Sequence, residues 1–394
     1  MILHLFKENS LNESRAIVME RPGNIKLQNF PFPKTDKDTA ILKISLCGIC
    51  GTDKHVYKDE SKSHPLGLPT KFPIIPGHEI VGTIESLGAS AKSVMGLDPS
   101  EEVEEGARVI PIVDLRCENC WACRNFPGWP VCEKGETYGW GISSKDPPYL
   151  FGGFADFMYL LPNTRLVRVP DDIPDKIAVF AEVLAVGVTS MQRASHSTQA
   201  YREGFAPAGD VVIQGSGPLA LSHIIAAKVA GANRIIVVGK PKYRVDYLKE
   251  KFGVDHAFNV DDATFEQRTR DILEILDGKG ADLVIECTGY PEVVEEGLTY
   301  VKPFGTYVIA GIYTDLGRSS TINVQKLISG KYTTVIGVPG QTMQSYRAAL
   351  RIMSKYKSQI PFDEIVTHKF PLEEFDLAMK KAISEESMKV AVRP

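Results

Sequence analysis

The sequence lacks any apolar run close to the roughly 18 residues that a membrane-spanning helix needs. Residues 1–10 also lack the basic segment and the small-residue cleavage site of a secretion signal. Lysine and arginine (45) do not outnumber aspartate and glutamate (49), so there is no basic excess to attract nucleic acid or an anionic membrane. We therefore expect a cytoplasmic protein that has neither nucleic acid nor a membrane as its partner.

The composition does provide for a sizeable folded structure. The 394 residues are 43% hydrophobic, enough for two domains that each bury a core. Over residues 15–170, short apolar runs separated by glycine and proline predict mostly β-strands. From about Ala178, apolar strands such as Asp210–Gln214 and Arg234–Val238 alternate with helical stretches, which predicts a parallel sheet covered by helices. The sequence therefore predicts an α/β protein whose two halves differ in architecture.

A glycine-rich turn joins the predicted strand Asp210–Gln214 to a predicted helix over 218–230. Gly215 suits a tight turn, Gly217 lets the backbone approach a pyrophosphate, and Ala220 allows close packing of helix on strand. The N-terminus of the helix offers free N–H groups to phosphates. The alternative is a tight packing turn without a ligand. The predicted cofactor-binding residues of this turn are Gly215, Gly217, Pro218 and Leu219.

The end of the second predicted strand favours NADP over NAD. Turns selective for NAD place an acid there to hold the adenosine ribose, but this chain has Gly239. Lys240, Lys242 and Arg244 follow, and such cations attract a 2′-phosphate. We predict that Gly239, Lys240 and Arg244 bind the cofactor and that this cofactor is NADP. The alternative is that these cations only form a solvated loop and that NAD binds without the acid.

Four of the seven cysteines fall at Cys117, Cys120, Cys123 and Cys132. Four thiolates at such short spacing can surround one ion tetrahedrally, and a closed shell of four cysteines is typical of structural zinc. Disulfides and unpaired thiols are the alternatives. The predicted role is structural, because a closed shell leaves no open position for a substrate.

A second, open metal site needs about three protein ligands and one exchangeable position. Cys50 and His78 offer a thiolate and an imidazole, and Glu79 and Glu182 offer carboxylates. Each of these residues taken alone is more often structural. Their combination with the cysteine cluster and the glycine turn points to a catalytic metal.

In the order and spacing of these motifs, residues 15–394 resemble a zinc-containing medium-chain alcohol dehydrogenase, in particular the sorbitol, threonine and polyol dehydrogenase branch. The motifs that carry the resemblance are Gly77-His-Glu79, Gly152–Asp156, the four-cysteine segment and the Gly215 turn. The resemblance implies a β-rich, GroES-like catalytic domain over 1–180 and 345–394, with a zinc lobe at about 114–135. It implies a Rossmann domain, a doubly wound parallel sheet that binds the dinucleotide, over 181–344.

The resemblance also implies roles for single residues. Cys50 matches the first ligand of the catalytic zinc and His78 the second. The third ligand is Glu79 or Glu182, because the branches of the family differ at this point. By the same resemblance, Asp53 orients the zinc-bound histidine and Lys389 lies near the cofactor pyrophosphate. Thr52 and His55 are placed to relay the alcohol proton to solvent; the alternative is that they only form hydrogen bonds within their loop.

The implied activity is hydride transfer between a secondary alcohol or polyol, or its ketone, and NAD(P), with two zinc ions per chain in a homodimer or homotetramer. One alternative is a zinc-free reductase of activated double bonds on the same fold, which a metal count would reveal. Another is a nucleotide-binding scaffold without turnover, which a test of many alcohols would reveal. The sequence does not define the substrate.

Overall fold

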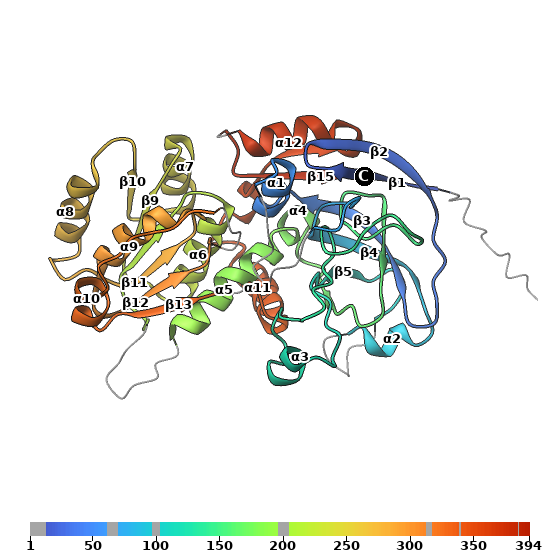
Figure 1. The fold of residues 1–394 in the computed structure, drawn as a ribbon, viewed down its shortest axis with the longest axis horizontal. Helices are drawn as coiled ribbons and strands as arrows, with labels where there is room; N and C mark the ends of the chain where they lie inside the picture. The colour runs from blue at the N-terminus through green and yellow to red at the C-terminus, as the bar shows by residue number, and fades with distance from the viewer. Residues whose placement is uncertain are drawn as a thin grey trace, which may run out of the picture.

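The computed structural model describes residues 13–60, 70–96, 103–195, 205–312, 317–338, 340–384 and 386–394. Figure 1 shows two units side by side, an α/β unit on the left and a β-rich unit on the right. Within the described residues no helix has the length and apolar character to cross a membrane.

The β-rich unit is built on a mostly antiparallel sheet of seven strands that joins the two ends of the chain. The strands are, in spatial order, β14 (Val366–Pro371), β15 (Lys389–Arg393), β3 (Ala40–Gly48), β4 (Glu79–Leu87), β5 (Arg108–Pro111) and β7 (Leu166–Arg168), with β6 (Phe157–Leu160) paired to β3. Val392 of β15 lies opposite Cys47 of β3 in an antiparallel pair. The last strand of the chain therefore completes the sheet that carries Gly48 and Glu79.

The remaining elements of this unit surround the sheet. A separate hairpin is formed by β1 (Glu13–Arg21) and β2 (Asn24–Pro31). The α-helices are α1 (Gly51–Tyr57), α2 (Ala91–Val94), α3 (Trp121–Asn125), α4 (Asp175–Ala178) and α12 (Phe375–Ile383), and the short 3₁₀ turns are η3 (Phe362–Glu364) and η4 (Leu372–Glu374).

The α/β unit contains the predicted parallel sheet, which is confirmed. Its six strands are, in spatial order, β10 (His256–Asn259), β9 (Ile235–Gly239), β8 (Val211–Gln214), β11 (Ala281–Glu286), β12 (Val301–Ile309) and β13 (Thr334–Gly337), and every neighbouring pair is parallel. The strand order reverses between β8 and β11. Ligands of doubly wound sheets bind outside the carboxyl ends of the strands at such a point, and the glycine turn follows β8.

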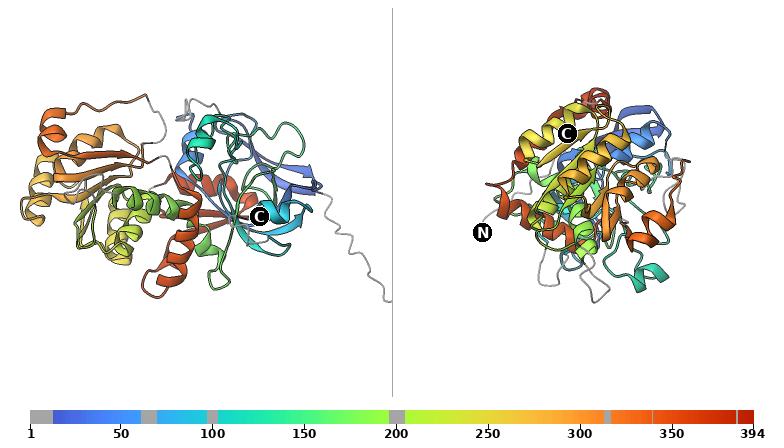
Figure 2. Two further views of the ribbon diagram at one scale, coloured as in Figure 1. Left: turned by 90° about the horizontal axis from the view of Figure 1, so that it is seen from below. Right: turned by 90° about the vertical axis from the view of Figure 1, so that its left-hand side faces the viewer.

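Helices cover both faces of this sheet (Figure 2) because successive strand residues point to opposite sides. Val211 and Ile213 pack in one buried cluster with residues of α5 and α6, whereas Val212 packs in another with Ile272 and Leu298. The helices and 3₁₀ turns of this region are α5 (Ala181–Ser195), α6 (Pro218–Val229), α7 (Lys242–Phe252), α8 (Phe265–Ile275), η1 (Pro291–Val293), α9 (Val294–Tyr300), α10 (Val324–Leu327), η2 (Ser329–Lys331) and α11 (Met343–Tyr356).

One hydrophobic cluster continues from the parallel sheet into the β-rich unit. Leu46 and Val81, from β3 and β4, belong to the same buried cluster as Val211 and Ile213 of β8. The two units thus share a core. The domain boundaries at 180/181 and 344/345 stay a prediction.

Candidate active site and zinc lobe

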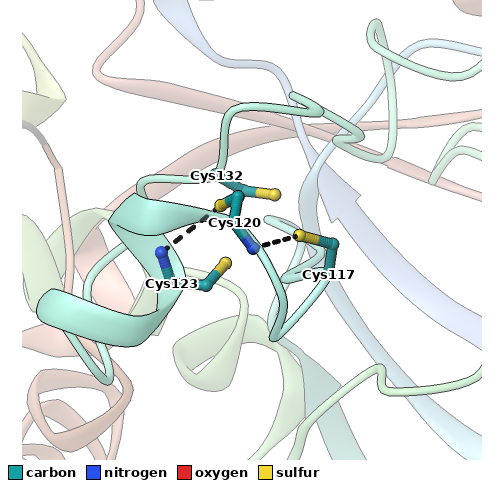
Figure 3. Close-up of side chains that lie close together, drawn as sticks. All are labelled: Cys117, Cys120, Cys123 and Cys132. Atoms are coloured by element: carbon teal, nitrogen blue, oxygen red, sulfur yellow. Dashed lines mark hydrogen bonds between the residues drawn. The ribbon is translucent and has the colours of Figure 1, made fainter.

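The four cysteines of the zinc lobe converge on one point (Figure 3). Their Sγ atoms all lie within 4.8 Å of one another, as ligands around a single ion require. Cys120 is the N-cap of the short helix α3, and Cys123 follows in its first turn. The four sulfurs that the sequence groups together are therefore grouped in space.

Backbone N–H groups donate to two of the sulfurs and favour their charged forms. Cys120 N–H donates to Cys117 Sγ at 3.3 Å, and Cys123 N–H donates to Cys120 Sγ at 3.4 Å. Hydrogen bonds from the backbone lower the pKa of Cys117, and they lower the pKa of Cys120 to about 6. Burial instead raises the pKa of Cys123 to about 12. A cation at the centre would stabilise all four thiolates.

Arg116 stabilises the lobe through hydrogen bonds to its backbone. Its guanidinium donates to the carbonyl oxygens of Cys123, Phe126 and Trp129 at 2.6, 3.1 and 2.6 Å. Three backbone oxygens of a segment without a regular core are thereby fixed by one buried side chain.

The candidate catalytic residues begin at the junction of β3 and α1. Cys50 is the N-cap of α1, and Asp53, three residues on, accepts a hydrogen bond from Cys50 N–H at 2.8 Å. The other oxygen of Asp53 accepts from Gly77 N–H at 3.1 Å and lies 3.7 Å from His78 Nδ1. One buried carboxylate thus joins the Cys50 segment to the His78 segment. Burial raises the pKa of Asp53, and the opposing influence of His78 limits this rise.

Glu79 has a buried cation as its partner. Lys389 Nζ contacts both carboxylate oxygens of Glu79 and also donates to the Ile49 carbonyl oxygen at 3.0 Å. Lys389 is 2% exposed and Glu79 is fully buried. Gly48 makes room for this pair, because a Cβ there would lie 2.1 Å from Glu79 Oε2. The predicted contact of Lys389 with a cofactor pyrophosphate stays a prediction; the contact seen is with Glu79.

Glu182 lies on α5 and is held from the side of α11. Gln341 Nε2 donates to Glu182 Oε1 at 2.9 Å and contacts the Tyr346 hydroxyl at 3.0 Å. Burial raises the pKa of Glu182 well above its usual range; the nearby His78 opposes this rise, and Cys50 adds to it. Within the described residues no ion pair reaches Glu182 or Cys50. The cation that acts on these two groups is Lys389, which pairs directly with Glu79 instead.

The candidate ligands of the second metal are less tightly gathered than the cysteines. Within the part of the chain that the structure describes, no three of Cys50, His78, Glu79 and Glu182 place ligand atoms within 4.8 Å of one another. His78 Nδ1 is buried without a hydrogen-bond partner. An imidazole, a thiol and a carboxyl of this kind are donors that zinc accepts. The catalytic metal site stays a prediction.

The two proposed relay residues occupy different environments on α1. Cys50 Sγ lies 3.9 Å from Thr52 Oγ1, so Thr52 borders the buried group. His55 Nδ1 lies 2.8 Å from Glu60 Oε2, and both side chains are partly exposed. The two residues thus lie between the buried group and the surface, as a proton path would require.

The glycine turn leaves space for a ligand. Gly215 has a φ of +123°, which favours glycine. Gly217 has an ordinary φ of −84°, yet a Cβ placed there would meet nothing within 4 Å. Gly217 is the N-cap of α6, which begins at Pro218, and no side chain caps the first-turn N–H groups. The site thus has the open space and the free helix terminus that a pyrophosphate needs.

The segment after β9 is hydrogen-bonded to this glycine turn. Ser216 Oγ donates to the Lys240 carbonyl oxygen at 2.6 Å. A Cβ on Gly239 would lie 2.9 Å from Gly215 and 3.0 Å from Ser216, so the residue is small for a packing reason as well. Lys240 is exposed, but Arg244 donates to the Ser387 and Ser384 carbonyl oxygens at 2.8 and 3.3 Å. Arg244 therefore connects α7 to the segment that precedes β15.

Sequence reasoning missed Glu286, the last residue of β11. It is fully buried, and its carboxylate accepts hydrogen bonds from the N–H groups of Gly289, Gly311 and Ile312 at 2.8, 3.0 and 3.0 Å, and from Thr288. It thereby joins the turns that follow β11 and β12. The sequence signal that could have identified Glu286 is an acidic residue at the end of a predicted apolar strand.

Lys54 was also missed. It follows Asp53 on α1, and burial together with the positive charges of Arg244 and Lys389 lowers its pKa to about 8. These charges lie on three separate segments. The cationic group could therefore not be read from one stretch of sequence.

Comparison with known proteins agrees with this architecture. Residues 36–171 match the alcohol dehydrogenase GroES-like domain, and residues 218–355 match the zinc-binding dehydrogenase domain. D-arabinitol dehydrogenase 1 of Uromyces fabae is 26% identical over 380 residues, which cover 96% of this chain and 97% of that protein. A probable alcohol dehydrogenase of Mycobacterium tuberculosis is 30% identical over 348 residues, which cover 86% of each chain. An alcohol dehydrogenase structure from Thermotoga maritima has a TM-score of 0.85 at 25% identity and covers 97% of this chain and 99% of its own.

A GroES-like sheet, a six-stranded Rossmann sheet and a four-cysteine lobe together define a zinc-containing oxidoreductase. The chain belongs to the zinc-binding medium-chain alcohol dehydrogenase family. It is an alcohol or polyol dehydrogenase that acts on CH–OH groups, and the resemblance stated from its motifs is confirmed.

Proposed function

We propose that this enzyme transfers a hydride between a secondary alcohol or polyol and NAD(P), with one zinc ion held by Cys50, His78 and Glu182. The observation that supports this proposal is a thiol, an imidazole and a carboxyl that, in the described residues, have no direct ion-pair partner of their own apart from the 3.7 Å approach of Asp53 to His78. Cys50 and Glu182 have no ion-pair partner in the described part of the chain, and His78 Nδ1 has no hydrogen-bond partner. A divalent cation would supply the missing charge.

Glu182 fits the third ligand position better than Glu79 does. The Glu79 carboxylate is already neutralised by Lys389, which also donates to the backbone of Ile49. In the described residues, the hydrogen bond to Glu182 comes from a neutral amide, and no cation pairs with its carboxylate directly. The proposed role of Glu79 is therefore to hold Lys389 beneath the site.

When bound, a zinc ion would supply Lewis-acid polarisation of the alcohol oxygen, and a nicotinamide cofactor would supply the hydride acceptor. The residues of this chain position these groups and conduct the proton. Asp53 fixes the relation between the Cys50 and His78 segments through its hydrogen bonds to Cys50 and Gly77. Thr52 borders the buried group and His55 contacts the surface acid Glu60, so the proton can leave along α1.

We propose NADP as the preferred cofactor. Gly239 puts no carboxylate near the adenosine ribose, and the exposed Lys240 is available to a 2′-phosphate. Arg244 contributes less to this proposal, because backbone carbonyls already occupy its guanidinium.

The test combines a zinc count with turnover of butan-2-ol and butanone, each with NAD and with NADP. We expect two zinc ions per wild-type chain and one for Glu182→Gln, with kcat lower by about 10³-fold because the metal supplies several kcal/mol of transition-state stabilisation. The matched control Glu79→Gln should retain both ions. A Glu182→Gln enzyme that keeps two ions and full kcat would contradict the ligand assignment.

A further inference from the structure

The strand order of the parallel sheet determines which half of a dinucleotide would lie over which turn. The order reverses between β8 and β11, and doubly wound sheets bind dinucleotides across such a point. In these sheets the turn after the first strand receives the pyrophosphate and the end of the second strand receives the adenosine ribose. Here these positions are the Gly215 turn and Gly239. The nicotinamide half would therefore extend to the other side, over the turns that follow β11 and β12.

The turns after β11 and β12 pack directly against the glycine turn. Cys287 N–H, immediately after β11, donates to the carbonyl oxygen of Gln214 in β8 at 2.8 Å. A Cβ on Gly215 would lie 3.1 Å from the Cys287 carbonyl oxygen. After β12, a Cβ on Gly311 would lie 2.8 Å from the Gly289 nitrogen. The three turns thus form one close-packed group at the carboxyl ends of the strands, and the position of each depends on the others.

The carboxylate of Glu286 holds two of these turns, one with each oxygen. Its Oε1 accepts from Gly289 N–H at 2.8 Å and from the Thr288 hydroxyl at 2.7 Å, both after β11. Its Oε2 accepts from the N–H groups of Gly311 and Ile312, each at 3.0 Å, after β12. Glu286 is fully buried, and among the described residues no cation pairs with it, whereas the four donor residues are partly exposed. The outer side of both turns is therefore accessible to a ligand.

Only a side chain with two acceptor oxygens can make this connection. A glutamine has nearly the same shape as Glu286 but a single acceptor oxygen, and its NH₂ group only donates. That NH₂ group would face the N–H groups of one turn, which would lose their acceptor. The substitution would therefore release one turn from the other without changing the volume of the side chain.

We propose that Glu286 is a positioning residue for the nicotinamide half of the cofactor, because it holds the turns after β11 and β12 in the arrangement that this half contacts. Glu286 lies beneath the turns and acts through their backbone, not on a reacting atom. The adenosine half, at the Gly239 end, does not depend on it. This inference rests on the proposed function, since it requires a dinucleotide on this sheet.

The experiment uses calorimetric titration to measure Kd for NADPH and for adenosine 2′,5′-bisphosphate, which has the adenosine half of NADPH but no nicotinamide nucleoside. We expect Glu286→Gln to raise Kd for NADPH about tenfold, the effect of one unsatisfied buried donor, and Kd for the bisphosphate less than about twofold. NADH and ADP form the corresponding pair, and the pair whose nicotinamide member the wild type binds more tightly is used. The ratio of the two Kd values is independent of the folded fraction, because both ligands bind the same folded molecules.

The matched control is Glu296→Gln, which removes a mostly buried carboxylate of the same unit that pairs with Arg268 at 3.0 Å between α8 and α9. It should leave the ratio at the wild-type value. If Glu286→Gln does not fold, Glu286→Asp, which keeps the charge but is one methylene shorter, carries the same expectation. An unchanged ratio in the Glu286 variant, an equal loss of affinity for both ligands, or the same shift in the control would overturn the positioning role. A wild type that binds neither NADPH nor NADH would instead overturn the proposed function.

Discussion

The cysteines of the zinc lobe come from a single segment, residues 117–132, whereas the proposed catalytic ligands come from the residue before α1, the residue before β4 and from α5. The lobe sulfurs lie within 4.8 Å of one another, but no three catalytic candidates do so among the described residues. A local motif thus brings its ligands together by chain spacing and a few backbone hydrogen bonds. The other group depends on long-range contacts through Asp53, Lys389 and Gln341.

The largest effect expected from this difference is on catalysis. Cys50→Ser should lose one of two zinc ions and lower kcat by about 10³-fold, as Glu182→Gln does, because the metal supplies several kcal/mol of transition-state stabilisation. Its thermal melting temperature should change little, since Cys50 lies between β3 and α1, next to a sheet that has its own core. Zinc content, kcat and melting temperature are measured together.

The matched variant in the lobe, Cys120→Ser, should give the opposite result. It should also lose one zinc ion, but its melting temperature should fall by at least about 5 °C while kcat changes far less. The lobe has little core besides the Arg116 contacts. If Cys50→Ser melted lower than Cys120→Ser, the assignment of structural and catalytic roles would be reversed.

The next largest effect concerns the ion pair beneath the catalytic group. Lys389→Met leaves the Glu79 carboxylate buried without its cation, and we expect a loss of about 3–5 kcal/mol in the free energy of unfolding in urea. The control is Lys381→Met, whose partner Glu386 is largely exposed, so that pair contributes at most about 1 kcal/mol. Equal losses of unfolding free energy in the two variants would show that the buried pair stabilises the fold no more than the exposed pair does.

The sequence allowed prediction of the elements that short segments determine. The glycine turn, the strands on either side of it and the four-cysteine lobe depend on spacing within a few residues, and the structure contains them. The partners of Arg244 and Lys389 could not be predicted, because they depend on how β15 and its preceding segment pack against α7 and β4. The position of Gln341 beside Glu182 likewise requires the packing of α11 on α5.

The smallest effect is expected on the preference of the enzyme for NADP over NAD. Lys240→Asp introduces repulsion toward a 2′-phosphate, and we expect kcat/KM for NADP to fall about tenfold relative to that for NAD, as for one lost ionic contact. Lys242→Asp is the control, because Lys242 pairs with Asp246 on its own helix. Equal losses for both cofactors in Lys240→Asp would exclude the proposed phosphate contact.

The pairing of β15 with β3 has a consequence for biosynthesis. The parallel sheet of β8 to β13 comes from one continuous stretch, so it can form as soon as that stretch leaves the ribosome. The sheet that carries Cys47 and Glu79 has to wait for residues 389–393. During synthesis the parallel sheet can therefore be complete while the half that was made first still lacks two strands, β14 and β15, and the cation that pairs with Glu79.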